Sequence, residues 1–225
     1  MRKTMKILGI DCTTKFTNVA IASEGAILSE VSLELGRLQS SQLPLIVEKM
    51  LYDTSVSISE LELIAAANGP GYYTGIRTGI AYSAALAKAL GIKILPVSSL
   101  EAFVHDLRTM GIPLAPIIRA RQNCIYCALY FSDGRELKPF VYPKFCPAAE
   151  FADFLMLYPE ALLVGNDVAL FSEFLALPNN VLPRAVGRPG QTALIGEYYK
   201  ELSISPEIIQ GAYLREPDIG PTSYI

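Results

Sequence analysis

Short apolar runs separated by turn residues fill the beginning of the chain and predict strands. Residues 6–10, 18–22 and 26–35 form three such runs, which is typical of a three-stranded meander. Residues 43–51 then carry apolar side chains at the i, i+3, i+4, i+7 and i+8 positions of one helical face. The chain therefore opens with a small sheet followed by an amphipathic helix.

Strand and helix patterns alternate in the next segment. Residues 61–68 form an apolar run that predicts a buried strand, and the alanine-rich residues 74–90 predict a helix that Gly91 ends. Residues 92–97 predict a further strand.

Two serines, each followed three residues later by a glutamate, predict capped starts of helical turns. Ser57 and Glu60 precede a short turn, and Ser98 and Glu101 begin a helix expected to run to Met110.

From Pro113 the pattern restarts, with strands before helices. The helices are predicted around residues 148–157, 168–175 and 191–202. This second set of strands and helices predicts two related α/β lobes, over residues 1–110 and 111–225.

Composition narrows the class of protein. No apolar run approaches the roughly 18 residues of a membrane helix, and the first residues lead directly into a strand, so we expect a soluble, cytoplasmic protein without a membrane contact. The four scattered cysteines fit a reducing compartment. With 19 basic and 22 acidic residues, the chain has no global excess of positive charge for holding nucleic acid.

The turn after the first strand is a weak candidate for cofactor binding. Asp11, Thr13 and Thr14 could wrap a phosphate or hold a magnesium ion. The same residue types also stabilise an ordinary β-turn through side-chain to backbone hydrogen bonds. The local sequence favours the second interpretation.

The segment NGPGYYTGIRTG, residues 68–79, is rich in glycine but lacks the nucleotide-binding patterns. Its glycine spacing is one residue too long for a dinucleotide fingerprint, and no Gly-Lys-Ser/Thr follows. In the helix behind it, small residues recur every fourth position in two rows, which are Gly75, Gly79, Ser83 and Ala87, and Ala81, Ala85 and Ala89. Such ridges let another helix approach closely. That helix could be residues 43–51 or belong to another chain.

Other candidates have weaker support. His105 is the only histidine, so it cannot form a histidine pair for a metal, and we expect it at the surface or its boundary. Cys124 and Cys127 lie three apart in a predicted strand and would point to opposite faces. Arg119 and Arg121, in a predicted loop, could contact phosphate or a partner's carboxylate, and Tyr213 to Arg215 could anchor the tail.

Four blocks in order, KILGIDCTTKFTNVAI, GPGYYTGIRTGI, APIIRARQNCIYCALY and AYLREP, resemble the bacterial TsaB family, also called YeaZ. The second block is the most specific, because it is close to the family pattern GPGSFTGLRIG. The third departs from the family's DAR-type motif and lacks its acidic residues. The resemblance implies an actin-like ATPase (ribonuclease H-like) fold of two lobes, each with a mixed sheet flanked by helices.

The resemblance also implies a function. TsaB proteins are non-catalytic partners of TsaD, with which, and with the ATPase TsaE, they form N6-threonylcarbamoyladenosine at position 37 of tRNAs that read ANN codons. The family implies no cofactor of its own, ATP and metal on the partner subunits, a homodimer when alone, and indirect tRNA contact through the complex. The implied partner interface comprises Tyr72, Tyr73, Thr74, Gly75, Arg77, Gly79 and Ser83.

Two other functions are compatible with the same fold. A small-molecule kinase would use Asp11 to Thr14 as its phosphate turn, although this turn has no glycine and the second-lobe counterpart RARQN has no acid. A metallopeptidase would need two histidines, which the chain does not have.

Overall fold

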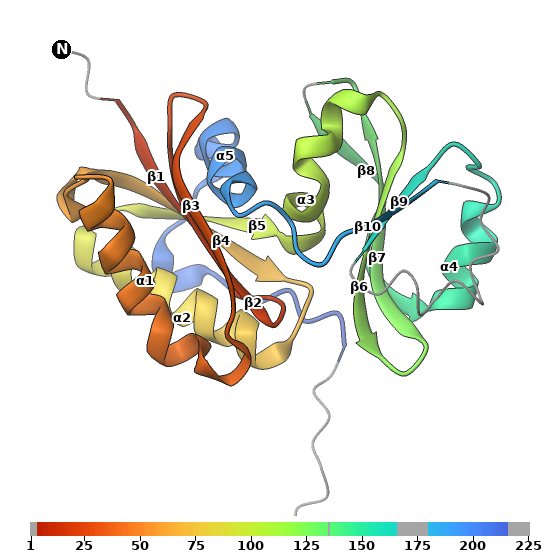
Figure 1. Cartoon of the computed structure of the whole chain (residues 1–225), viewed down its shortest axis with the longest axis horizontal. Helices are drawn as coiled ribbons and strands as arrows, with labels where there is room; N and C mark the ends of the chain where they lie inside the picture. Colours follow the sequence, from red (N-terminus) through yellow and green to blue (C-terminus); the bar gives the residue numbers. More distant parts are fainter. Residues whose placement is uncertain (1–3, 135, 166–179, 216–225) are drawn as a thin grey trace, which may run out of the picture.

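The computed structural model describes residues 4–134, 136–165 and 180–215, which form two lobes side by side (Figure 1). Each lobe is built on a mixed five-stranded sheet. The predicted α/β class with two related lobes is confirmed.

The first lobe begins with the predicted meander. Its sheet has the order β3-β2-β1-β4-β5, in which β1, β2 and β3 are antiparallel and β4 and β5 run parallel to β1. The strands are β1 Lys6–Asp11, β2 Phe16–Ser23, β3 Ala26–Glu34, β4 Leu61–Gly69 and β5 Lys93–Ser98. The helices are α1 Gln39–Asp53, α2 Tyr73–Leu90 and α3 Ser99–Val104, with short 3-10 turns at Gly36–Leu38, Ile58–Glu60 and His105–Met110.

The second lobe repeats this topology. Its sheet order β10-β9-β6-β7-β8, read from β8, has the same sequence of three antiparallel strands followed by two parallel ones. The elements are β6 Leu114–Arg121, β7 Cys124–Ser132, β8 Leu137–Pro147, α4 Ala148–Leu155, β9 Leu162–Gly165 and β10 Val181–Pro183. The repeated order is that of the predicted actin-like ATPase fold. The helix predicted over residues 168–175 lies outside the described residues.

The chain then returns to the first lobe. Helix α5, Gly190–Tyr198, packs on β1, β2 and β4, and the 3-10 turns Lys200–Leu202 and Pro206–Ile208 follow it. The approach is close: a β-carbon at Gly9 would lie 2.5 Å from the backbone nitrogen of Ala193. The sequence predicts a second lobe over residues 111–225, whereas the contacts of α5 are with the first lobe.

Helices cover both faces of each sheet. On the first sheet, α1 and α2 cover the face of Leu8 and Ile10, and α5 covers the face of Ile7. On the second sheet, α4 covers one face, and Leu100 and Phe103 of α3 pack on the other. Helix α3 therefore lies between the two lobes. None of the helices in the described part of the chain has the length and apolar character needed to cross a membrane.

Only one of the two predicted capping boxes forms. The Ser57 amide donates a hydrogen bond to Glu60 Oε2 at 2.8 Å, as expected. Ser98 makes no cap bond, and its hydroxyl lies 3.5 Å from the Tyr130 hydroxyl of the second lobe. The predicted helix to Met110 is confirmed in part, because α3 ends at Val104, a 3-10 turn continues to Met110, and Gly111 then ends it in the left-handed conformation.

Arg184 ties the returning segment to the end of α3 and to the 3-10 turn after it. Arg184 donates to both carboxylate oxygens of Asp106 at 2.8 and 2.7 Å and to the Phe103 carbonyl at 2.9 Å. The two charged side chains are only 18% and 12% exposed. Bidentate geometry and low exposure make this pair stronger than an ordinary surface pair.

Replacing Arg184 with Met should lower the free energy of unfolding by about 2–4 kcal/mol, because Asp106 would keep a largely buried charge without its partner. Arg188→Met is the matched control, since Arg188 is 55% exposed and lies 3.6 Å from Glu30, a pair worth about 0–1 kcal/mol. Urea denaturation of both variants measures the difference. Equal losses in the two variants would contradict the assignment.

The buried carboxyl group of Glu101 should make the stability of the protein depend on pH. Its Oε1 is buried without a hydrogen-bond partner among the described residues, and burial raises its pKa to about 7. Between the unfolded pKa near 4.5 and pH 7 the folded state binds more protons, so this group's contribution to stability is lost as pH rises.

Glu101→Gln cannot ionise and should therefore be more stable than the wild type above pH 7, by about 1–3 kcal/mol. The difference should disappear below pH 4.5. Denaturation curves at several pH values test this, with the exposed Glu160→Gln as the control. A pH-independent difference would refute the role of ionisation.

Candidate functional site

The turn after β1 is held by its own side chains. Asp11 Oδ1 accepts hydrogen bonds from the Thr13 amide at 2.8 Å and the Thr13 hydroxyl at 2.7 Å, and Thr14 Oγ1 accepts one from the Phe16 amide at 3.2 Å. These are the local bonds of Asx and Ser/Thr turns. Burial raises the pKa of Asp11, and the bonds from Thr13 oppose that rise. The structure thus brings Asp11, Thr13 and Thr14 together as a structural turn.

The glycine segment lies directly on this turn. The Tyr72 amide donates to the Thr13 carbonyl at 2.6 Å. A β-carbon at Gly71 would lie 2.1 Å from the Thr13 carbonyl oxygen, and one at Gly75 would lie 1.9 Å from the Cys12 oxygen. These distances are far below contact, so only glycine fits at the two positions. The glycines serve backbone packing within the chain.

Gln39 also contacts the turn after β1, and no sequence pattern predicts this role. This buried side chain at the start of α1 donates to the Thr14 and Phe16 carbonyls, both at 3.0 Å. The turn's carbonyl groups are therefore paired within the protein. A glutamine in a polar stretch carries no pattern that would have predicted these bonds.

The two small-residue rows of α2 face opposite environments. Gly75, Gly79, Ser83 and Ala87 are buried, and a β-carbon at Gly79 would lie 3.4 Å from the Cys12 β-carbon. Ala81, Ala85 and Ala89 are exposed. The predicted interface residues Gly75, Gly79 and Ser83 are therefore buried within the lobe, where Gly75 and Gly79 approach Cys12 in the turn after β1. The remaining predicted residues, Tyr72, Tyr73, Thr74 and Arg77, are exposed.

A shallow groove runs along the exposed side of α2. It has a volume of about 500 Å³ and is lined by Ser40, Leu43, Tyr73, Thr74, Arg77, Thr78, Ala81 and Tyr82. Of the residues that line it, Tyr73 is 40% exposed. We call this face of α1 and α2 the α1–α2 surface. Its small side chains and exposed apolar groups suit the close approach of another protein.

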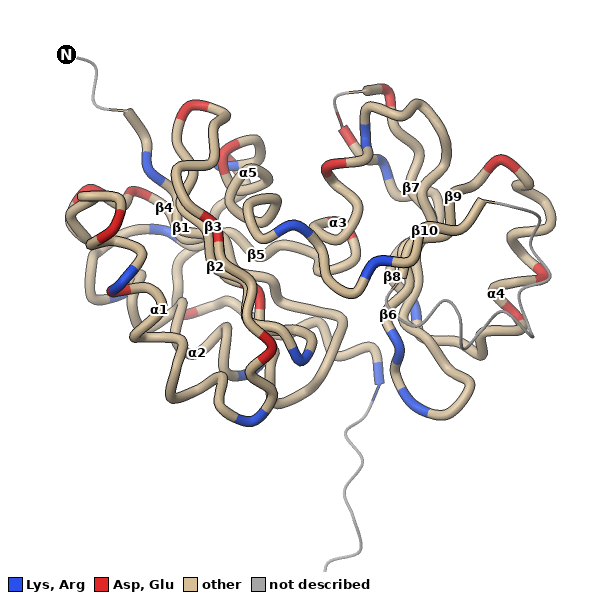
Figure 2. The backbone as a smooth tube through the Cα atoms, in the orientation of Figure 1, with Lys and Arg blue, Asp and Glu red and all other residues tan. Residues whose placement is uncertain are grey.

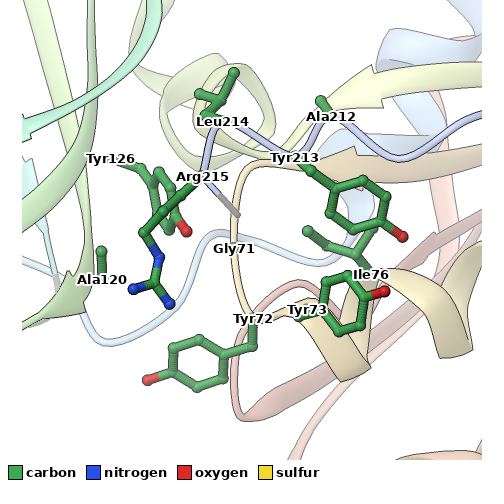
Figure 3. Close-up of a pocket in the computed structure, with 10 residues that line it drawn as sticks. All are labelled: Gly71, Tyr72, Tyr73, Ile76, Ala120, Tyr126, Ala212, Tyr213, Leu214 and Arg215. Atoms are coloured by element: carbon green, nitrogen blue, oxygen red, sulfur yellow. The ribbon is translucent and has the colours of Figure 1, made fainter. Parts of the chain in front are cut away.

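A second cavity, of about 190 Å³, lies where the lobes and the tail meet (Figure 3). Its lining, which we call the tyrosine pocket, comprises Gly71, Tyr72, Tyr73, Ile76, Ala120, Tyr126, Ala212, Tyr213, Leu214 and Arg215.

The tail is anchored as the sequence suggested. The Ala212 amide donates to the Asn68 carbonyl at 2.7 Å, and the Tyr213 ring lies 5.0 Å from that of Tyr73. The approach of Ala120 and Tyr126 was not predicted, because it depends on how the lobes pack. Arg119 and Arg121 flank Ala120 and are exposed at the end of β6, a strand where a loop was expected.

The other candidate residues, His105 and the cysteines, are placed by packing within the protein. His105 is 3% exposed, contrary to the expected surface position, and burial lowers its pKa to about 4. The Cys127 sulfur lies 3.4 Å from Cys146 on β8 rather than beside Cys124. Among the described residues, no three His, Cys, Asp or Glu side chains are grouped to hold a metal ion.

The Gly75→Ala and Gly79→Ala variants compare the cost of a backbone clash with the gain in helix propensity. Gly75→Ala should lower the free energy of unfolding by more than about 2 kcal/mol, because the new β-carbon would overlap the Cys12 carbonyl. Gly79→Ala should stay within about 1 kcal/mol of the wild type, since alanine favours helices and its β-carbon has room. Thermal unfolding measures both, and similar stabilities would contradict the close approach at Gly75.

Comparison with known proteins agrees with this architecture. The family model for TsaD, tRNA N6-adenosine threonylcarbamoyltransferase, matches residues 27–188. The chain is 29% identical to the tRNA threonylcarbamoyladenosine biosynthesis protein TsaB of Bacillus subtilis, over 76% of this chain and 75% of that one. It is 27% identical to the Escherichia coli TsaB, over 57% and 56% of the two chains.

A solved structure shares the fold. YeaZ from Pseudomonas aeruginosa superposes with a TM-score of 0.81 at 21% identity, covering 93% of this chain and all of that one. The fold, the motif blocks and the family match agree, and the chain belongs to the TsaB (YeaZ) family, within the wider group that the threonylcarbamoyltransferase model describes.

Proposed function

We propose that this chain is the accessory subunit, without an active site of its own, of a TsaD-type complex that forms N6-threonylcarbamoyladenosine at position 37 of ANN-decoding tRNAs. The observation that carries the proposal is the α1–α2 surface, an exposed face with small residues on α2 in a member of the TsaB family. The printed names of the Bacillus and Escherichia relatives support the link to this tRNA modification.

The turn after β1 supports a non-catalytic role. In a kinase of this fold the turn would contact phosphate, whereas here the glycine segment and Gln39 cover it from within the chain. His105, the only histidine of the sequence, is buried in the protein interior. We therefore assign ATP and metal to the partner subunits and favour the accessory role over the kinase and the metallopeptidase.

The α1–α2 surface would serve two alternative partners. A second copy of the chain could pair with it through a two-fold axis, which makes the same patch face itself. A TsaD-type subunit with a related fold could replace that copy. A TsaE-type ATPase and the tRNA would then join the heterodimer, with most of the tRNA contact on the partner.

Ala81→Arg tests this pairing. The long, charged side chain would project from the exposed face of α2 and should weaken association with a TsaD-type subunit at least about 10-fold, because close approach of small residues is lost. Size-exclusion chromatography and an assay for the modified adenosine measure the effect, and circular dichroism checks folding.

Ala149→Arg, an exposed position at the start of α4, is the matched control and should pair normally. Unchanged pairing of Ala81→Arg would argue against the surface. Turnover of ATP by the isolated chain in the presence of magnesium, measured by calorimetry, would instead support the kinase function.

A further inference from the structure

Glu101 of α3 is a buried acid that costs the fold stability instead of supporting it. Its Oε1 atom has no hydrogen-bond partner within the described residues 4–134, 136–165 and 180–215. Because burial raises its pKa to about 7, ionisation of this carboxyl group destabilises the folded state at neutral pH. Groups kept at such a cost are concentrated at sites that bind or react.

Glu101 lines a pocket that is separate from the two sites described above. The pocket has a volume of about 280 Å³ and lies along β5, the edge strand of the first sheet, where α3 and α5 both pack on that strand (Figure 1). We call it the Glu101 pocket. None of its described lining residues also lines the α1–α2 surface or the tyrosine pocket. The lining comprises Leu95, Pro96, Val97, Ser98, Glu101, Ile195, Tyr199 and Leu202.

The walls of the Glu101 pocket are mainly apolar. Leu95, Val97 and Ile195 are buried, whereas Leu202 is 67% exposed and borders the opening. The volume lies just below the roughly 300–1,000 Å³ of pockets that enclose a drug-sized molecule, so the ligand of this pocket is small. Such walls suit a short aliphatic chain.

The polar groups of the pocket point to a cation as the charged part of that ligand. The Ser98 hydroxyl lies 3.5 Å from the Tyr130 hydroxyl, and the described lining contains no basic residue. Glu101 is therefore the one ionisable acid in an apolar lining, and Tyr199 adds an aromatic ring that also attracts cations. A bound cation would supply the hydrogen bonds and the opposite charge that the carboxylate lacks.

The arginines of the segment between β10 and α5 have acidic partners of their own. Figure 2 shows these basic residues where the segment passes α3. Arg184 forms its bidentate pair with Asp106, and Arg188 lies 3.6 Å from Glu30. Both arginines are thus engaged with other acids than Glu101.

We propose that the Glu101 pocket binds a small organic cation, a primary ammonium group on a short aliphatic chain. The ammonium group donates to the Glu101 carboxylate, and the chain packs against Leu95, Val97 and Ile195. The attraction between the two charges is stronger in this apolar lining than in water. The α1–α2 surface takes no part, so this binding is independent of the pairing of subunits.

Binding should tighten as pH rises, because the ammonium group pairs with the ionised carboxylate. An alkylammonium ion, like a lysine side chain, stays protonated up to about pH 10. With a pKa of about 7, the ionised fraction of Glu101 rises about 10-fold between pH 6 and pH 8. Tyr130 of β7 and Tyr199 of α5 also titrate near Glu101, but burial raises the pKa of both, that of Tyr199 to about 12, so they stay neutral in this range.

A chemical-shift titration of the isotope-labelled full-length chain with n-butylammonium chloride tests the inference, with sodium butyrate and 1-butanol as probes of matched length. Butylammonium should bind at millimolar concentrations, about 10-fold tighter than either matched probe and about 10-fold tighter at pH 8 than at pH 6. Glu101→Gln should weaken this binding about 10-fold at pH 8 and remove its pH dependence. The exposed Glu160→Gln is the control and should bind within 2-fold of the wild type.

Leu202→Arg is a second, independent variant. It places a fixed positive charge at the opening of the pocket and should also weaken binding about 10-fold, whereas Leu157→Arg, at a 73% exposed position of the second lobe, should not. Four outcomes would overturn the inference: no binding of butylammonium by the wild type at millimolar concentrations, equal binding of 1-butanol, unchanged binding by Glu101→Gln or Leu202→Arg, or an affinity that does not depend on pH.

Discussion

The close contact between the glycine segment and the turn after β1 determines how the first lobe is built. Gly71 and Gly75 bring the start of α2 onto the carbonyl groups of Cys12 and Thr13, at distances that exclude a side chain. This contact holds the start of α2 against the turn after β1. It also sets Tyr72 and Tyr73 at the boundary between the lobes.

Helix α2 therefore has two roles on two faces. Its buried row allows the helix to lie close to β1, and its exposed alanines then form a low, smooth ridge beside α1. The same kind of small residue appears in both rows for different reasons. Internal packing fixes the inner row, and the outer row remains available to another protein.

The sequence predicted much of the fold because periodicity reports burial directly. The meander, α1, α2 and the Gly91 stop followed from apolar spacing and one glycine, and the structure confirms them. The sequence did not distinguish the residues of α2 that face inward from those that face outward. A four-residue repeat identifies a ridge but not the direction in which it faces. Gly75, Gly79 and Ser83, which the family resemblance implies at a partner interface, are buried within the lobe.

The features that the sequence did not predict depend on contacts between segments far apart in the chain. Gln39 donates hydrogen bonds to the carbonyl groups of Thr14 and Phe16, which lie 25 and 23 residues earlier in the sequence, and no local pattern predicts these bonds. Glu101 matched a capping box, yet the chain turns into a 3-10 helix and Ser98 lies instead near Tyr130. The tyrosine pocket joins residues from both lobes and the tail, so it exists only once the lobes have packed.

The return of the chain through α5 has a mechanical consequence. Two covalent connections join the lobes, one after the 3-10 turn at His105–Met110 and one between β10 and α5. Tyr72 of the first lobe lines the tyrosine pocket together with Ala120 and Tyr126 of the second. The width of this pocket is therefore set by how the two connected lobes are placed against each other.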